Sequence, residues 1–156
     1  MIEVDTYILF ELGGFTYGIR SREVQRVEML EHVTPVPNTA PSVDGVVFSK
    51  GKVMPVLNLR ARFGLPRVPA TRQTRLIVLS VQQRAVALIV DAAREFRRIP
   101  AEGVRPIEET LHGVDGNYVE GVATVKERMV LLLDVAAVLR PEEINVPDGA
   151  SRAPSL

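Results

Sequence analysis

The residue types that most often catalyse reactions or bind metals are few in this chain and poorly spaced for either task. It has two histidines, His32 and His112, no cysteine and six serines. Neither histidine has a second ligand at the spacing of a zinc site, and no serine lies in a Gly-x-Ser-x-Gly turn. Gly13-Gly14 is not followed by the lysine and serine of a phosphate-binding loop. We therefore expect no catalytic residue, no metal and no cofactor.

Two carboxylates offer an alternative, a site assembled from scattered polar residues such as Asp91 and Asp134. Asp134 and Asn58, however, each follow an apolar run and precede a short stretch with helical spacing. Their side-chain oxygens suit an N-cap, which accepts a hydrogen bond from a free backbone N–H in the first turn. Capping is the favoured interpretation, and an enzyme is the weakest hypothesis.

Composition narrows the remaining classes of function. Apolar residues make up 46% of the 156 residues, which excludes a disordered chain. The 19 basic and 19 acidic side chains balance, and aromatic residues are only 5%, so a small β-barrel that binds nucleic acid is a disfavoured alternative. The basic cluster Arg94, Arg97 and Arg98 is interrupted by Glu95, which indicates a solvated face.

No apolar run spans a membrane and no signal peptide begins the chain, so we expect a cytoplasmic protein without membrane insertion.

The pattern of apolar residues predicts strands. Tyr7–Leu12 and Phe15–Ile19 are β-prone runs joined by Gly13-Gly14, which is typical of a tight hairpin. Pro55 within a later apolar run predicts an edge strand or a bulge, because proline cannot donate to a central ladder.

The chain also repeats itself. Tyr7–Val27 is similar to Leu76–Phe96 at an offset of 69, and Val43–Asn58 is similar to Val119–Asp134 at an offset of 76. Matching glycines, lysines and caps make the second pair the stronger one. Two homologous β-units in tandem are the simplest explanation.

With these strands and no reactive site, a protein-interaction module is the class that remains, and the sequence resembles one such family. The segments that carry the resemblance are Gln25–Gly45, Lys50–Gly64, Leu88–Asp91, Val119–Val122 and Leu131–Asp134. They are similar to the CheW coupling proteins of bacterial chemotaxis, and the similarity runs from about Tyr7 to Leu139.

The resemblance implies an all-β fold of two tandem five-stranded SH3-like barrels with short capping helices. It implies one CheW-like domain over residues 1–145, with approximate halves 1–68 and 69–145, and a flexible tail over 146–156. It also implies a non-catalytic adaptor that couples methyl-accepting chemoreceptor tips to the regulatory domain of a CheA-type histidine kinase.

The family's contact residues fall on two groups of positions here. The receptor-contacting group falls on Val24, Arg26 and Val27, and Lys50 stands where the family usually has an arginine. The kinase-contacting loop falls on four consecutive residues, Val43, Asp44, Gly45 and Val46. Each group has a structural alternative: the valines as core residues, Lys50 as an exposed turn lysine like Lys126, and Gly45 as a backbone requirement like Gly121.

Two departures from the family pattern bear on the choice of partner. Arg26 reverses the charge of the family's glutamate, and Lys50 lacks the planar fork of arginine. If both positions contact the receptor, the preferred receptor changes too. An adaptor of an accessory, non-flagellar chemosensory array is therefore the alternative within this class.

Overall fold

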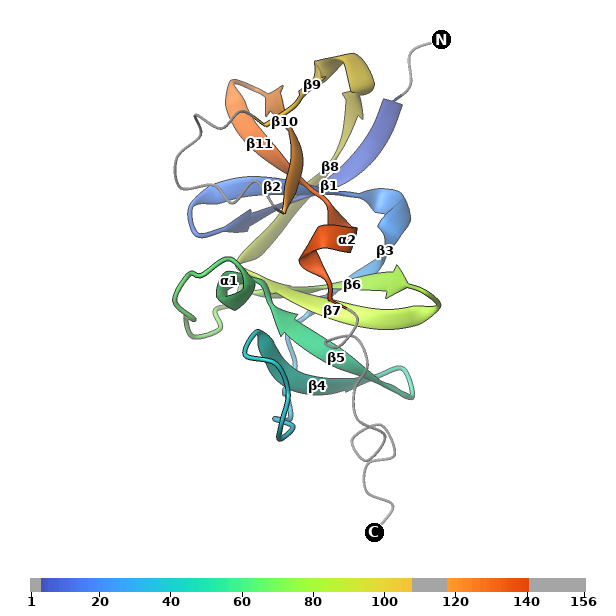
Figure 1. Ribbon diagram of the computed structural model, residues 1–156, viewed down its shortest axis with the longest axis vertical. Coiled ribbons are helices and arrows are strands. Elements are labelled where there is room, and N and C mark those ends of the chain that lie inside the picture. The colour runs from blue at the N-terminus through green and yellow to red at the C-terminus, as the bar shows by residue number, and fades with distance from the viewer. Residues whose placement is uncertain (1–3, 108–117, 141–156) are drawn as a thin grey trace.

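Two β-sheets dominate the computed structural model, which describes residues 4–107 and 118–140 (Figure 1). The six-stranded sheet has, in order across it, β8 (Ala92–Pro100), β1 (Val4–Leu12), β2 (Phe15–Arg20), β11 (Arg128–Leu133), β10 (Val119–Val125) and β9 (Val104–Arg105). The five-stranded sheet has β3 (Val24–Met29), β6 (Arg75–Val81), β7 (Arg84–Val90), β5 (Lys52–Asn58) and β4 (Val43–Ser49). Single turns of helix join or follow the strands: η1 (Ser21–Glu23), α1 (Leu59–Arg62), η2 (Ala101–Gly103) and α2 (Val135–Val138).

Each sheet surrounds a small core of its own, and we name the two barrels by their place in the chain. The inserted barrel is the five-stranded sheet and comes from the continuous segment 24–90; the terminal barrel is the six-stranded sheet and is built from the segments on either side of it. The all-β fold with short capping helices is thus confirmed. The terminal barrel has six strands, not the expected five, because the two-residue β9 adds to its edge.

A third and larger core lies between the barrels. In β6, Leu76 and Val78 face the interior of the inserted barrel, while Ile77 and Leu79 face the junction with the terminal barrel. Successive side chains of a strand point to opposite faces, so a strand that is buried on both faces needs a continuous apolar run. This explains why the central strands read as unbroken aliphatic segments in the sequence.

Strand exchange relates the two barrels to the sequence repeat. Residues 1–68 contribute β1 and β2 to the terminal barrel and β3, β4 and β5 to the inserted one. Two parallel pairings complete the sheets, β5 with β7 and β11 with β2. The halves 1–68 and 69–145 therefore describe the repeat in the sequence, whereas the sheets draw strands from both halves. The expected tail, 146–156, lies outside the described residues.

The repeat is visible at the hairpins. The turn residues Gly13-Gly14 correspond to Gln82-Gln83, and Lys50-Gly51 corresponds to Lys126-Glu127, at the offsets of 69 and 76. All eight have positive φ, between 50° and 87°, as two-residue turns of type I′ require. The predicted hairpin at Gly13-Gly14 is confirmed.

The predicted caps are confirmed as well. Asn58 accepts a hydrogen bond from Ala61 N at the start of α1, and Asp134 accepts one from Ala137 N at the start of α2. The backbone N–H groups of both caps donate into the loop before the neighbouring strand, to Ser42 O and Tyr118 O. The caps thus tie each short helix to its barrel.

The prediction of an edge strand at Pro55 was wrong, because β5 is an inner strand between β7 and β4, and the bulge in this pair lies in β4, between Val43 and Gly45. Pro55 lies opposite Val46, whose N–H and C=O both bond outward to Thr34. The parallel register with β7 begins at Val56. No ladder bond therefore needs the N–H that proline lacks.

Candidate interaction surfaces

A β-bulge in β3 places Val24 and Val27 on one face of the strand. The register shifts after Val24, so that Val24 lies opposite Leu79 and Val27 lies opposite Ile77. Both partners belong to the core between the barrels, so both valines face the junction. Val24 is half-buried against that core, whereas Val27 is 37% exposed. β3 is also the edge strand of its sheet, which leaves this apolar side of the junction accessible.

Arg26 lies on the opposite face of β3, where β3 meets the end of β4. We call this end of the inserted barrel, and the equivalent end of the terminal barrel, the mouth. It forms an ion pair with Glu28, and its Nη2 donates to the Ser49 hydroxyl at 3.3 Å. Ser49 in turn donates to Glu28 Oε1 at 2.8 Å. The hydrogen bond from Arg26, then that from Ser49 and the nearby charge of Lys50, hold the pKa of Glu28 below its usual value. The charge of Arg26 is thus largely matched within the molecule.

Lys50 belongs to the same mouth and lies in the exposed turn between β4 and β5, with φ of 52°. The receptor candidates therefore form two groups: Val24 and Val27 at the junction, and Arg26 and Lys50 at the mouth of the inserted barrel.

The kinase candidates lie on β4, the other edge of the inserted barrel. Gly45 has φ of 142°, and a Cβ there would be 2.1 Å from the carbonyl oxygen of Thr34. At the equivalent Gly121, a Cβ would meet Val104 Cγ1 at 2.7 Å. In both barrels a crossing segment approaches the bulge too closely for a side chain, so Gly45 has a structural reason of its own.

The other three kinase candidates differ in what they expose. Val43 is half-buried against the core between the barrels, and Val46 is buried. Asp44 accepts from Asn58 Nδ2 and from Arg67 Nε, both at 2.9 Å. It therefore links the cap of α1 to the segment that follows α1, and it is the one polar side chain of the four.

Sequence reasoning missed Phe96 on β8, which is 68% exposed. Phe96 lies opposite Ile8 in the terminal barrel, as Val27 lies opposite Ile77 in the inserted barrel. The offset of 69 relates both pairs. Because β8 is an edge strand like β3, each barrel presents an apolar side chain from the same position on an edge. Applying the repeat to Val27 would have found it.

The two carboxylates considered for catalysis have structural partners. Asp134 caps α2, and Asp91 accepts two hydrogen bonds from Arg60, at 2.8 and 2.7 Å, and one from Gly13 N at 2.9 Å. Arg60, followed by the Gly13 N–H, lowers the pKa of Asp91.

Over residues 4–107 and 118–140, no cluster of three or more metal-ligating side chains occurs. Within the same ranges, no helix has the length and apolarity to cross a membrane.

Fold and surfaces together define a double β-barrel protein with exposed apolar side chains on an edge strand of each barrel. The chain belongs to the CheW-like domain family, whose family model matches residues 6–143. The resemblance noted in the sequence is confirmed over nearly the whole chain.

Individual relatives agree with this assignment. The chain is 31% identical to the chemotaxis protein CheW of Klebsiella aerogenes over 147 residues, which cover 94% of this chain and 89% of that protein. It is 30% identical to CheW of Bacillus subtilis, with coverage of 92% and 93%. The crystal structure of the scaffolding protein TtCheW from Thermoanaerobacter tengcongensis superimposes with a TM-score of 0.77 at 26% identity, covering 85% of this chain and 90% of that one.

Proposed function

We propose that this protein is a non-catalytic chemotaxis adaptor that couples the cytoplasmic tips of chemoreceptors to the regulatory domain of a CheA-type histidine kinase. Family membership over residues 6–143 is the observation that carries the proposal. Since both proposed partners are cytoplasmic, the adaptor acts in the cytoplasm.

The receptor surface that we propose is the apolar side of the junction between the barrels. It comprises the half-buried Val24 and the exposed Val27 of β3, together with Phe96 at the equivalent position of β8. Exposed apolar side chains on edge strands suit the apolar face of a receptor helix, because a few buried anchors supply most of the binding energy of such contacts.

The kinase surface that we propose lies along β4, with Asp44 as its polar contact. Val43, Gly45 and Val46 shape this edge: the valines are packed inward and the glycine allows the close crossing of Thr34. A small barrel edge of this kind suits the modest interfaces of signalling complexes.

A titration against the purified regulatory domain of the cognate kinase and a receptor-tip fragment tests both surfaces. We expect micromolar binding of the kinase domain by the wild type. Val27→Asp and Phe96→Asp should each weaken receptor binding at least about tenfold, because they place a charge in an apolar contact. Phe15→Asp is the matched control, since Phe15 is also exposed, at 42%, but lies at the β1–β2 hairpin.

Val24→Asp separates a contact role from a core role. Lost receptor binding with an unchanged β-sheet circular dichroism spectrum supports a contact, whereas loss of the folded spectrum assigns Val24 to the core. Undetectable kinase binding by folded wild-type protein would refute the coupling function.

An adaptor of an accessory chemosensory array is the second candidate. The supporting observation is the mouth of the inserted barrel, where Glu28 matches the charge of Arg26 and Lys50 remains exposed. Lys50→Arg tests it: a gain in affinity for receptors of the main array supports altered receptor preference, and unchanged affinity for all receptors contradicts it.

A further inference from the structure

The mouths of the two barrels are built from equivalent positions but are closed differently. In the inserted barrel, Ser49 of β4 bonds to both Arg26 and Glu28 of β3, so polar side chains join the two edge strands. The repeat places Glu95, Arg97 and Val125 at the positions of Arg26, Glu28 and Ser49 in the terminal barrel. There the charges are exchanged, and the serine is replaced by a valine.

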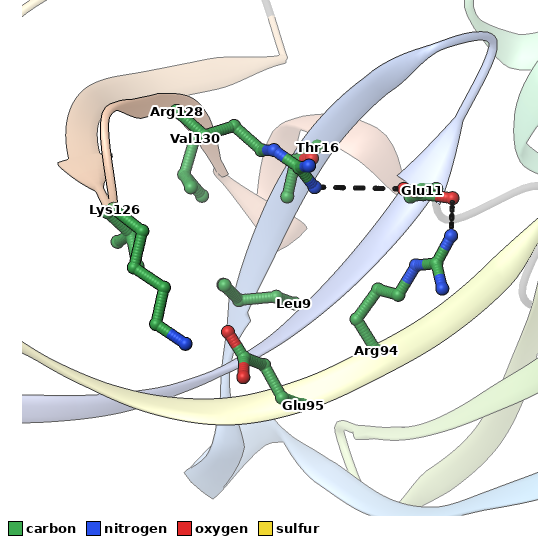
Figure 2. A pocket seen from close by; sticks show the side chains of 9 residues that line it. Leu9, Glu11, Thr16, Arg94, Glu95, Lys126, Arg128 and Val130 are labelled. Carbon is green, nitrogen blue, oxygen red and sulfur yellow. Dashed lines mark hydrogen bonds and ion pairs between the residues drawn. The ribbon is translucent and has the colours of Figure 1, made fainter.

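Valine cannot take part in the polar link, so the terminal mouth stays open. Arg97 pairs with Glu95 of its own strand, at 2.9 Å, and does not bridge to β10. Between β8 and the β10–β11 hairpin lies a hollow of about 440 Å³ (Figure 2). This volume is within the range of pockets that bind small molecules.

The floor of the hollow is apolar. Leu9 and Val130, both almost fully buried, and the partly buried Val125 line it, together with the buried Thr16. At the positions of Val130 and Thr16, the inserted barrel has Met54 and Ala85. The shorter valine in place of methionine contributes to the space above the floor.

The rim of the hollow carries unmatched positive charge. Both of its carboxylates already have close arginine partners: Glu11 binds Arg94 at 2.6 Å, and Glu95 binds Arg97. Arg128 reaches Glu11 only at 3.9 Å. Lys126 has no ion pair or hydrogen bond to the described residues. Its charge, after the hydrogen bond from Arg97, contributes to lowering the pKa of Glu95. In Figure 2 the ammonium of Lys126 extends over the hollow toward Leu9 and Glu95.

We propose that the mouth of the terminal barrel binds a small organic anion, a carboxylate joined to a compact apolar body. The apolar body lies on Leu9, Val125 and Val130, and the carboxylate is held between Lys126 and Arg128. None of these residues belongs to the receptor or kinase surfaces proposed above. The site is therefore independent of coupling, and failure of one proposal leaves the other testable.

The test is a titration of the full chain with 4-phenylbutyrate, followed by ¹H–¹⁵N correlation spectra. We expect saturable shifts centred on the amides of Leu9, Thr16, Val125 and Val130. The uncharged analogue 4-phenylbutanol should bind about five- to tenfold more weakly, since two partly exposed cations contribute modestly to affinity. Equal binding of the alcohol, shifts centred elsewhere, or no saturable shift would overturn the proposal.

Three variants locate the site. Val130→Met introduces the residue of the inserted barrel and should fill the floor and abolish binding. The double variant Lys126→Ala/Arg128→Ala changes only exposed side chains, so its fold is expected to persist; it should lose the preference for the acid over the alcohol. The matched control Lys50→Ala/Lys52→Ala removes the equivalent lysines of the inserted barrel and should bind like the wild type. An unchanged preference in the Lys126→Ala/Arg128→Ala protein would contradict the assigned contacts.

Discussion

The inserted and terminal barrels share the glycine of the bulge and the helix cap, and they differ at their mouths. Both have a glycine at the bulge, at Gly45 and Gly121, and both begin their last short helix with a capping side chain. At the mouths, in contrast, Arg26 is replaced by Glu95. A backbone feature that repeats, such as the glycine of the bulge, has a geometric cause. Side chains that differ at the mouths are the better candidates for a contact that only one barrel makes.

The largest expected effect tests this rule at the bulges. Gly45→Ala should lower the free energy of unfolding by about 3 kcal/mol, because the new Cβ meets the backbone of Thr34 at a positive φ. Gly121→Ala should cost about half as much, since its nearest contact is the Val104 side chain, which can move. Urea unfolding measures both. Equal losses would contradict the prediction, because they would mean that a clash with the Thr34 backbone costs no more than a clash with the Val104 side chain.

The next prediction concerns the hydrogen bonds of Asp91 that link the two barrels, which have no equivalent at the repeat position of Arg60. Asp91, between β7 and β8, accepts hydrogen bonds from Gly13 N–H of the terminal barrel and from Arg60 of the inserted barrel, whereas the repeat places Ala136 at the position of Arg60. Asp91→Asn should cost about 1–2 kcal/mol at pH 7, because it weakens charge-assisted hydrogen bonds that are partly solvated.

The pH dependence of Asp91→Asn gives a second readout. The folded protein holds the pKa of Asp91 below its ordinary 3.8. Its stabilising contribution is therefore complete above that value and is lost as the pH falls through the lower, folded pKa. The stability of wild type and variant should converge on acidification. A gap that stays constant down to pH 2.5 would contradict a role for the charge. Glu102→Gln, at an exposed carboxylate of η2, is the control.

Smaller effects are expected at the caps. Asp134→Ala should cost about 1 kcal/mol, the usual value of an N-cap. Asn58→Ala should cost more, because Asn58 also donates to Asp44. Thermal unfolding of both variants checks the order, and a larger loss at Asp134 would show that the bond to Asp44 adds nothing.

The smallest effect compares two hairpin turns. Glu127 has φ of 65°, and the equivalent Gly51 has φ of 78°. Glu127→Gly should stabilise the protein by about 0.5–1 kcal/mol by relieving left-handed strain, and Gly51→Glu should destabilise it by a similar amount. Chemical unfolding should show opposite signs for the two variants. The same sign in both would mean that the glutamate side chain has contacts that outweigh the strain.

Local features could be predicted from the sequence because neighbouring residues determine them. The Gly13-Gly14 hairpin, the caps at Asn58 and Asp134 and the two repeat offsets all follow from short segments. The interpretation of Gly45 as a backbone requirement followed from comparison with Gly121 alone.

Long-range features could not be predicted in the same way. A strand that is buried on both faces looks the same whichever strand it pairs with, so the parallel pairings of β5 with β7 and of β11 with β2 leave no local signal. The inner position of Pro55 depends on Thr34, which lies in another part of the chain. The mouth hollow depends on residues from β1, β8 and the β10–β11 hairpin, which only the folded chain brings together.

The exchange of strands also orders events during synthesis. β1 and β2 leave the ribosome first, yet Thr16 of β2 must wait for Val130 of β11 before its parallel neighbour exists. All strands of the inserted barrel are available by Val90. Because contacts between distant segments form late, we expect the inserted barrel to form before the terminal barrel. The terminal barrel can close only once β11 has been made.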